Sequence, residues 1–496
     1  MLYAHTLGRA ARYTANHLGV VDGERRYTYG ELATRVERLA GRLTAMGFSP
    51  GDRLAFLLPN GCEFIELTFA CARTGILAVP INTRYSVPEI DAVLADCTPR
   101  GLVRHESLPK PTVAVPWEVV LPGEPLEGSS DPAPGPLHDP AALLGLFYTS
   151  GTTGRAKGVM LTHANLLANM YHFNSWAPMR YPDVWLHAAP MFHVADFPTI
   201  LICAASGLAQ ATIPRFDPRL FCEAVAREGV TATVLIPTMI NFLSQCPDIA
   251  RNDISSLKTI LYGGSPMAPD ILRRAREKLP GVRLSQGYGL TETAPLLTVL
   301  ADEDHAGERI LSCGQPPVGV ELRIVDPEGN PVPVGTPGEI VARGANIMKG
   351  YWNQPEATRA ALVDGWFHTG DIAREDSDGF FYIVDRSKDM IVTGGENVYS
   401  SEVEAAVYSH PAIKECAVIG IPDPEWGEIV AACVVVKDGA ALAADDLVAH
   451  CRSRLANYKL PRRVEFIDGE LPKSGSGKIL KRTLREPFWK DQTRRV

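Results

Sequence analysis

The chain has 496 residues, of which 46% are hydrophobic and 21% charged, a composition typical of a globular enzyme with more than one domain. Its net charge of −8 argues against a nucleic-acid-binding protein, because such proteins present a basic face. The N-terminus lacks the apolar run of a signal peptide, and the most apolar stretch, residues 199–213, is too short to span a bilayer, so we expect a cytoplasmic protein without an integral membrane segment.

Helical and strand-like segments alternate through the first 390 residues. Apolar side chains recur at helical spacing over residues 29–46, residues 53–58 form an apolar run typical of a buried strand, and residues 63–75 are predicted to form another helix. This alternation predicts an α/β fold of parallel or mixed sheets layered with helices. Residues 99–140 contain ten prolines, which predicts a connection rather than a core element.

A change of pattern near residues 386–396 predicts two domains, a large N-terminal domain over residues 1–386 and a smaller, mobile α+β lid domain over residues 387–496. Ser401 and Glu404 are spaced to form a capping box at the first helix of the lid. The elements predicted for the lid are helices at 400–409 and 445–455 and strands at 415–421, 428–436 and 464–467.

The clearest chemical motif is LFYTSGTTGRAKGVMLTH, at residues 146–163. An apolar strand leads into a loop of glycines and hydroxyl side chains that ends at Lys157. Glycines let backbone N–H groups approach phosphate oxygens closely, and a lysine adds positive charge. The loop is not a Walker A motif, because Ala156 precedes the lysine and Gly158 follows it. The sequence therefore predicts a phosphate-binding loop of another kind, against the alternative of a flexible Ser/Gly turn.

The segment TSGTTGRAKG resembles the phosphate loop of the acyl-adenylate-forming (AMP-binding) superfamily, which includes acyl-CoA synthetases, adenylation domains and beetle luciferases. Seven further motifs that resemble the family follow in the right order. They are PMFHVAD (190–196), YGGSP (262–266), QGYGLTET (286–293), GWFHTGD (365–371), DRSKD (385–389), GGENVY (394–399) and PKSGSGKIL (472–480). Eight ordered motifs make the resemblance specific, and Ala156, where many members carry proline, is a small departure.

The resemblance implies an ATP site and a magnesium ion. Contacts with the β- and γ-phosphates are implied for Thr149, Ser150, Gly151, Thr152, Thr153, Gly154 and Lys157. Residues implied to line the adenine and the acyl group are Gly263, Gly264, Ser265, Gln286, Gly287, Tyr288 and Gly289. Thr291 would face the α-phosphate, and Glu292 would hold Mg²⁺, a cation that prefers oxygen ligands. Asp371 would bind the ribose hydroxyls, and Arg386 the ribose or a phosphate, unless it forms a surface pair with Asp385 or Asp389.

The same resemblance places His193 beside the carboxylate of the acid substrate. Asp196 either caps a helix, which we favour, or meets a polar group of the substrate. The implied acyl pocket comprises Val194, Ala195, Asp196, Phe197, Met239, Gly264, Leu296 and Leu297. Because this lining is mostly apolar, we expect a fatty or aromatic acid rather than acetate or an amino acid.

In the C-terminal domain, the resemblance implies that Lys478 enters the closed site and neutralises charge on the carboxylate and the α-phosphate. A hinge at Lys388 would rotate this domain, and Gly394 and Gly395 would then line a tunnel for the pantetheine arm of coenzyme A. The candidate contacts for the phosphates of coenzyme A are Lys459, Arg462 and Arg463. The remaining lysines and arginines after residue 472 are predicted to form a solvated basic tail.

The predicted function is an ATP-dependent acyl-CoA ligase. It would adenylate a hydrophobic carboxylic acid with release of pyrophosphate and then transfer the acyl group to coenzyme A with release of AMP. The alternatives are a stand-alone enzyme that loads a separate carrier protein, a luciferase-like oxygenase, and a nucleotide sensor without activity. The ten cysteines are scattered without a CxxC pair and are predicted to be small buried residues rather than metal ligands. The oligomeric state stays open, although homodimers are common in the family.

Overall fold

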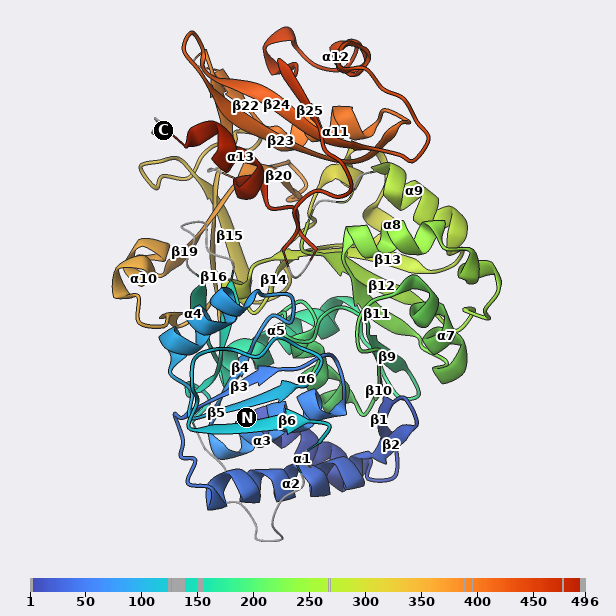
Figure 1. Cartoon of the computed structure of the whole chain (residues 1–496), viewed down its shortest axis with the longest axis vertical. Coiled ribbons are helices and arrows are strands. Elements are labelled where there is room, and N and C mark those ends of the chain that lie inside the picture. The colour runs from blue at the N-terminus through green and yellow to red at the C-terminus, as the bar shows by residue number, and fades with distance from the viewer. Residues whose placement is uncertain are drawn as a thin grey trace. The chain divides into compact units, whose positions relative to one another are not determined.

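A computed structural model describes residues 3–123, 126, 139–149, 156–265, 267, 269–386, 389–394, 396–474 and 477–490 (Figure 1). The chain divides into two compact units. The large unit comprises Met1–Met267, Arg273–Glu321 and Ala342–Phe367. The small unit comprises Ala268–Leu272, Leu322–Val341 and His368–Val496.

The large unit contains an eight-stranded sheet whose central strands are parallel (Figure 1). Its strands, in spatial order, are β14 (Leu296–Leu300), β13 (Arg283–Gly289), β12 (Thr259–Gly263), β11 (Ala232–Leu235), β9 (Val184–His187), β10 (Ala209–Thr212), β1 (Leu18–Asp22) and β2 (Arg25–Thr28). The two outer strands, β14 and β2, run antiparallel to their neighbours. Parallel strands that are connected through helices bury both faces of a sheet, which explains why every residue of β10 and β11 is buried.

A second sheet of the large unit has seven strands. In spatial order they are β17 (Gly350–Tyr351), β8 (Lys157–Thr162), β7 (Leu143–Thr149), β4 (Leu77–Pro80), β3 (Arg53–Leu57), β5 (Gly101–His105) and β6 (Trp117–Leu121). The helices are α1 (Tyr3–Tyr13), α2 (Tyr29–Ala45), α3 (Cys62–Thr74), α4 (Val87–Cys97), α5 (His163–Trp176), α6 (Phe197–Ser206), α7 (Pro218–Glu228), α8 (Pro237–Gln245), α9 (Pro269–Lys278) and α10 (Pro355–Ala361). A capping box between Thr28 and Glu31 fixes the start of α2.

A third sheet has the strand order β15 (Val320–Val325), β16 (Gly338–Gly344), β19 (Trp366–Glu375) and β18 (Leu362–Val363), with β20 (Phe381–Arg386) beside β19. The boundary between the two units falls within α9, β15, β16 and β19.

The small unit is built around a sheet with the order β22 (Glu396–Val398), β21 (Ile391–Thr393), β24 (Gly427–Val436) and β23 (Ile413–Asp423), with β25 (Arg463–Phe466) beside β24. Its helices are α11 (Ser400–Tyr408), α12 (Ala444–Arg452) and α13 (Lys481–Trp489). Both faces of the sheet are covered, because alternate residues of β23 and β24 enter two different cores. Val403 of α11 and Leu447 of α12 belong to one core, and Leu484 of α13 packs against the other.

The predicted α/β architecture is confirmed, as are the helices at 29–46 and 63–75 and the elements of the lid, within a few residues at each end. The prediction for residues 99–140 is wrong in part, because β5 and β6 lie within this range and β5 pairs with β3. The prediction of a capping box formed by Ser401 and Glu404 is also wrong. Ser401 donates to the backbone oxygen of Val384, and Glu404 accepts from Val418 N, so neither side chain closes the helix start.

The cysteines behave as small core residues, as predicted. All ten are free thiols, and every one except Cys246 is buried. Burial raises the pKa of Cys433 to about 11 and that of Cys97 to about 12, so these thiols are poor nucleophiles at neutral pH. No helix in the described part of the chain has the length and hydrophobicity needed to cross a lipid bilayer.

Candidate functional site

Four neighbouring parallel strands of the eight-stranded sheet deliver the predicted acid and adenine residues to one edge. His193 follows β9, Met239 lies in the helix after β11, and Gly264 follows β12. The fourth strand, β13, carries Gln286 and Tyr288 near its end. Since the carboxyl ends of parallel strands lie at the same edge of a sheet, these residues of the large unit gather there, which is where α/β proteins bind ligands.

Glycines in β12 and β13 allow the two strands to approach closely. A Cβ atom at Gly263 would lie 2.2 Å from the carbonyl oxygen of Gly287, its register partner. A Cβ atom at Gly289 would lie 1.7 Å from the carbonyl oxygen of Pro295. The small residue at these positions is therefore required by neighbouring backbone, a reason that the motif alone did not reveal. Gly264 is different, because its φ of +81° favours glycine and the nearest atom to its Cβ position, Ile236 Cγ2, is 3.7 Å away.

The predicted phosphate loop connects the two strands of a hairpin. β7 and β8 pair antiparallel, and Thr149 lies opposite Lys157. The hairpin thus brings the first and last residues of the predicted phosphate-binding set together. The predicted contacts Ser150, Gly151, Thr152, Thr153 and Gly154 lie outside the described residues.

Lys157 and Glu292 both contact Tyr351, a residue that the sequence prediction missed. The ammonium nitrogen of Lys157 lies 4.6 Å from the centre of the Tyr351 ring, and the Tyr351 hydroxyl donates to Glu292 Oε1 over 2.9 Å. Burial, together with the charge of Glu292, raises the pKa of Tyr351, which keeps its hydroxyl protonated as a donor. Thr291 and Glu292 lie in the short helix Thr291–Thr293 that follows β13. The structure therefore brings a predicted phosphate contact and the predicted magnesium ligand to one aromatic side chain.

The loop that carries His193 is held by Asn60, which follows β3. The buried amide of Asn60 donates to the carbonyl oxygens of Ala189 and His187 over 2.9 and 3.2 Å and accepts from Met191 N over 2.8 Å. The half-buried ring of His193 accepts from Ala195 N through Nδ1 over 3.1 Å. Three hydrogen bonds to one side chain fix the path of this loop, and nothing in the motif PMFHVAD pointed to Asn60.

Asp196 requires a correction. It occupies the position before α6, but its carboxylate makes no capping bond. The side chain is fully buried and bonded to His187 Nδ1 over 2.7 Å, to Trp185 Nε1 over 3.2 Å and to Thr199 Oγ1 over 3.0 Å. Asp196 therefore acts neither as a side-chain helix cap nor as a contact for a polar group of the substrate, because His187, Trp185 and Thr199 already bond both of its carboxylate oxygens in the core.

Other members of the predicted acyl pocket divide into two groups. Phe197 is fully buried and packs edge-on against Phe147, with ring centres 4.7 Å apart, so it belongs to the core of the large unit. Val194, Met239 and Leu296 are buried apolar side chains with exposed fractions of 1%, 5% and 6%. These three remain candidates for an apolar wall.

In the small unit, Asp371 and Arg386 lie opposite each other across β19 and β20. Asp371 is 3% exposed, and its backbone N–H donates to Thr369 Oγ1. The side chain of Arg386 and the predicted hinge residue Lys388 lie outside the described part of the chain. Asp385 accepts from the backbone N–H and the hydroxyl of Ser400, so it has a structural role.

Lys478 lies in a tight loop of the small unit. Ser474 N donates to the carbonyl oxygen of Lys478 over 2.6 Å, and Lys478 N donates to Ser474 Oγ over 3.1 Å. Its ends are joined by a β-bridge between Lys473 and Ile479. These bonds tie the backbone on both sides of Lys478 to Lys473 and Ser474.

The prediction of a solvated basic tail is wrong for three residues. Lys473 pairs with Glu415 over 2.6 Å, Lys481 with Glu404 over 2.7 Å, and Arg485 with Asp389 over 3.2 Å. Burial opposes the charge of Lys481, but the carboxylates around it, Glu404 first, raise its pKa overall. These ion pairs attach the C-terminal segment to β23, to α11 and to the turn before β21.

A cation and an aromatic ring lie beside the predicted pantetheine glycine. The Arg462 guanidinium lies 4.3 Å from the centre of the Trp426 ring, and Gly394 N donates to the carbonyl oxygen of Trp426 over 2.8 Å. Of the other predicted phosphate contacts, Lys459 pairs with Glu402 and Arg463 with Glu465. Gly395 lies outside the described residues. Trp426 was missed by the sequence prediction, although a tryptophan in a polar turn was the available signal.

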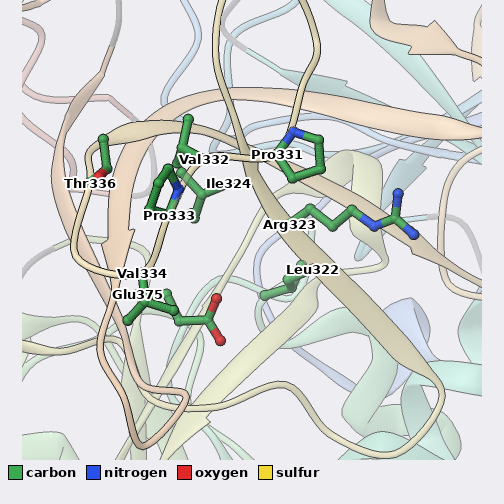
Figure 2. A pocket seen from close by; sticks show the side chains of 9 residues that line it. All are labelled: Leu322, Arg323, Ile324, Pro331, Val332, Pro333, Val334, Thr336 and Glu375. Carbon is green, nitrogen blue, oxygen red and sulfur yellow. The ribbon is translucent and has the colours of Figure 1, made fainter.

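A separate small pocket of about 130 Å³ lies in the small unit, where β15 and the segment over residues 331–336 meet Glu375 of β19 (Figure 2). It is lined by Leu322, Arg323, Ile324, Pro331, Val332, Pro333, Val334, Thr336 and Glu375. None of the predicted site residues lines it, so it is not part of the candidate site.

Family models match most of the chain. The AMP-binding enzyme model matches residues 7–352, and the model of the AMP-binding enzyme C-terminal domain matches residues 402–478. The chain belongs to the AMP-binding enzyme family. The resemblance predicted from the eight motifs is thereby confirmed, and so is the prediction of an AMP-forming acid–thiol ligase.

Several relatives of this AMP-binding enzyme are similar over nearly their full length. It is 44% identical to a feruloyl-CoA synthase of an Amycolatopsis species over 97% of this chain and 98% of the relative. It is 36% identical to the long-chain-fatty-acid–CoA ligase FadD13 of Mycobacterium tuberculosis over 93% of both chains. Among solved structures, o-succinylbenzoate CoA synthetase (MenE) of Bacillus subtilis in complex with its acyl-adenylate intermediate aligns with a TM-score of 0.87, 30% identity and 97% coverage of both chains.

Proposed function

We propose that this protein is an ATP-dependent acyl-CoA ligase that acts through an acyl-adenylate. The carboxylate of an organic acid attacks the α-phosphorus of ATP and pyrophosphate leaves. The thiol of coenzyme A then attacks the acyl carbonyl and AMP leaves. The protein supplies positioning and charge stabilisation rather than a covalent nucleophile, which agrees with its buried, high-pKa thiols.

The observation that carries this proposal is the pair of contacts that Tyr351 makes with Lys157 and Glu292. A phosphate-binding cation and a carboxylate meet at one side chain, although 135 residues separate them in the chain. Charges of opposite sign around one side chain suit a metal-bound polyphosphate, whose oxygens need both a cation and a carboxylate-held metal.

Magnesium fits the donors present. Glu292 offers a hard oxygen ligand, and one protein carboxylate is enough because Mg²⁺ usually completes its coordination with water and substrate phosphates. When bound, the ion would neutralise negative charge on the phosphates as pyrophosphate departs. The residues of this chain would hold ATP around it, with Lys157 at the β- and γ-phosphates, Thr291 at the α-phosphate, Tyr288 against the adenine and Asp371 at the ribose.

The proposed division of labour assigns the small unit a second task. Lys478 would assist adenylate formation, and rotation about Lys388 would then bring the Gly394 turn to the adenylate. Trp426 and Arg462 support coenzyme A as the acceptor, since an aromatic face and a guanidinium bind a pantetheine arm and phosphates well. The names of the relatives favour this reading over the loading of a carrier protein.

For the acid, we propose an aromatic substrate of the phenylpropenoic class. The greater identity to a feruloyl-CoA synthase than to a fatty-acid ligase supports this choice. Val194, Met239 and Leu296 would provide the apolar wall, with Gly264 leaving room for a flat ring. A cytoplasmic location is proposed on the free state of all ten thiols.

The proposal is tested by incubating the purified protein with MgATP, coenzyme A and a panel that contains ferulic, coumaric, benzoic, octanoic and palmitic acids. We expect equimolar AMP, pyrophosphate and acyl-CoA, with the highest kcat/KM for a phenylpropenoic acid. A preference for palmitic acid would refute the substrate assignment. Formation of ADP, or thioester formation only with a phosphopantetheinyl carrier protein, would refute the proposed activity.

A further inference from the structure

The segment over residues 344–352 runs between the two halves of the proposed ATP site within the large unit. On one side it joins the hairpin, because Tyr351 pairs with Val159 of β8 and Lys349 N donates to the carbonyl oxygen of Met160. On the other side it joins the Thr291–Thr293 helix, because Met348 N donates to the carbonyl oxygen of Glu292 over 2.8 Å.

Asn346 strengthens the second attachment. Its fully buried amide donates to the carbonyl oxygens of Thr293 and Leu296, each over 2.9 Å. From α5, Asn165 donates to the carbonyl oxygens of Ala345 and Ile347, each over 2.8 Å. Buried amides that each satisfy two backbone carbonyl groups fix a backbone rigidly. The segment therefore sets the distance between β8 and the Thr291–Thr293 helix.

Tyr351 is the residue of this segment whose side chain touches both proposed ATP-binding groups. Its hydroxyl donates a hydrogen bond to Glu292, and the face of its ring contacts the ammonium group of Lys157. A hydrogen bond from a neutral donor to a metal-binding carboxylate orients the ligand, and the loss of such a bond commonly weakens metal binding. An ammonium group over an aromatic face is held in position without the loss of its charge.

We propose that Tyr351 is a positioning residue that couples the magnesium carboxylate to the phosphate lysine. Its hydroxyl fixes the orientation of Glu292, and its ring fixes the position of the Lys157 ammonium group. The proposal rests on the function proposed above, because it takes the roles of Glu292 and Lys157 from it. The two parts of one side chain are separable, since phenylalanine keeps the ring and removes only the hydroxyl.

The experiment measures ATP binding to the full chain by calorimetry, in EDTA and across a magnesium titration, without any acid present. For Tyr351→Phe we expect unchanged ATP affinity in EDTA and a half-saturating magnesium concentration raised roughly tenfold. For Tyr351→Leu we expect the same magnesium shift and, in addition, ATP affinity in EDTA weakened about threefold.

Tyr382 provides a matched control in the small unit. Its hydroxyl donates to Asp376 Oδ2 over 2.9 Å, and the Arg374 guanidinium lies 4.1 Å from its ring centre. Tyr382→Phe therefore removes the same kind of bond from a tyrosine whose hydrogen bond and ring contact involve neither Lys157 nor Glu292, and it should leave the magnesium dependence unchanged. Far-UV circular dichroism and the melting temperature identify any variant that is misfolded, and Tyr351→Phe is the more conservative of the two test variants.

An unshifted magnesium requirement in Tyr351→Phe, or an equal shift in Tyr382→Phe, would overturn the proposal while the ligase function stands. Failure of the unaltered protein to bind ATP would instead overturn the proposed function, and with it the role of Tyr351. A loss of ATP affinity in EDTA that is equal in Tyr351→Phe and Tyr351→Leu would show that the ring does not hold Lys157.

Discussion

Replacing Gly394 by alanine should impair thioester formation and spare adenylate formation. A Cβ atom at this position would lie 2.7 Å from Cε3 and 3.0 Å from Cζ3 of Trp426, whereas ordinary contacts begin near 3.4 Å. The indole ring must therefore move by about 0.7 Å, from 2.7 Å to the ordinary contact distance of 3.4 Å. The backbone of Gly394 cannot move instead, because it is held by its bond to the carbonyl oxygen of Trp426.

Two costs contribute to this change. The φ of Gly394 is +58°, so alanine there carries left-handed strain of about 1 kcal/mol. The ring also shifts relative to the Arg462 guanidinium. A displacement of this size in a group that positions a substrate can lower the rate of the reaction by roughly tenfold or more. We expect kcat/KM for coenzyme A to fall by about tenfold, with little change in pyrophosphate exchange driven by the acid and ATP.

Gly439→Ala separates the two costs. Gly439 has a similar φ of +77°, but no atom lies within 4 Å of its Cβ position. This variant should show the strain, as a slightly lower melting temperature, without the kinetic defect. The reasoning would be refuted if Gly394→Ala slowed both half-reactions equally, or if Gly439→Ala lost as much thioester formation as Gly394→Ala.

Three further predictions concern single residues. Burial lowers the pKa of His163 from 6.5 to about 4, so the neutral ring, which accepts from Tyr3 N, is favoured in the folded state. The contribution of this neutral ring to the free energy of unfolding is complete above pH 6.5 and is lost, by up to about 3 kcal/mol, as the pH falls towards 4. His163→Gln should therefore flatten the dependence of the free energy of unfolding on pH, measured by urea denaturation over this range. An unchanged pH dependence in this variant would contradict the role of His163. Lys478→Ala should abolish adenylate formation yet leave thioester formation from supplied acyl-AMP largely intact, and an equal loss of both in separate assays would show that the division of labour is wrong. Lys481→Met leaves Glu404 without its ion-pair partner and should destabilise the protein by about 2 kcal/mol in thermal denaturation. The control Arg482→Met, at an exposed ion pair, should change stability by less than about 0.5 kcal/mol. Similar effects of the two variants would contradict the role of the Lys481–Glu404 pair.

The order of strands and helices was largely predictable, because hydrophobic periodicity reports which face of each element is buried. The failure at residues 99–140 has a physical cause. Prolines dominated the range, but β5 needs only five residues, and its neighbours β3 and β6 supply the pairing that a single sequence does not reveal. Ser401 failed as a cap for a related reason, since its hydroxyl found a partner far away in the sequence, the carbonyl oxygen of Val384.

The residues at the site were predictable only where a motif names them. Tyr351, Asn60 and Trp426 act through contacts with residues remote in sequence, and no local pattern encodes such contacts. Asp196 shows the opposite case. A motif position suggested a cap or a substrate contact, whereas tertiary packing gave its carboxylate three buried partners. Motifs thus indicate which chemistry is present, and the fold decides which side chains orient it.

Adenylate formation is tested most directly by the fate of the oxygen atoms of the acid. An aromatic acid labelled with ¹⁸O in its carboxylate is converted with MgATP and coenzyme A, and the products are analysed by mass spectrometry. If the carboxylate attacks the α-phosphorus, the released AMP carries one labelled oxygen and the pyrophosphate carries none. Label in pyrophosphate or orthophosphate, or unlabelled AMP alongside acyl-CoA, would contradict the mechanism proposed for this protein.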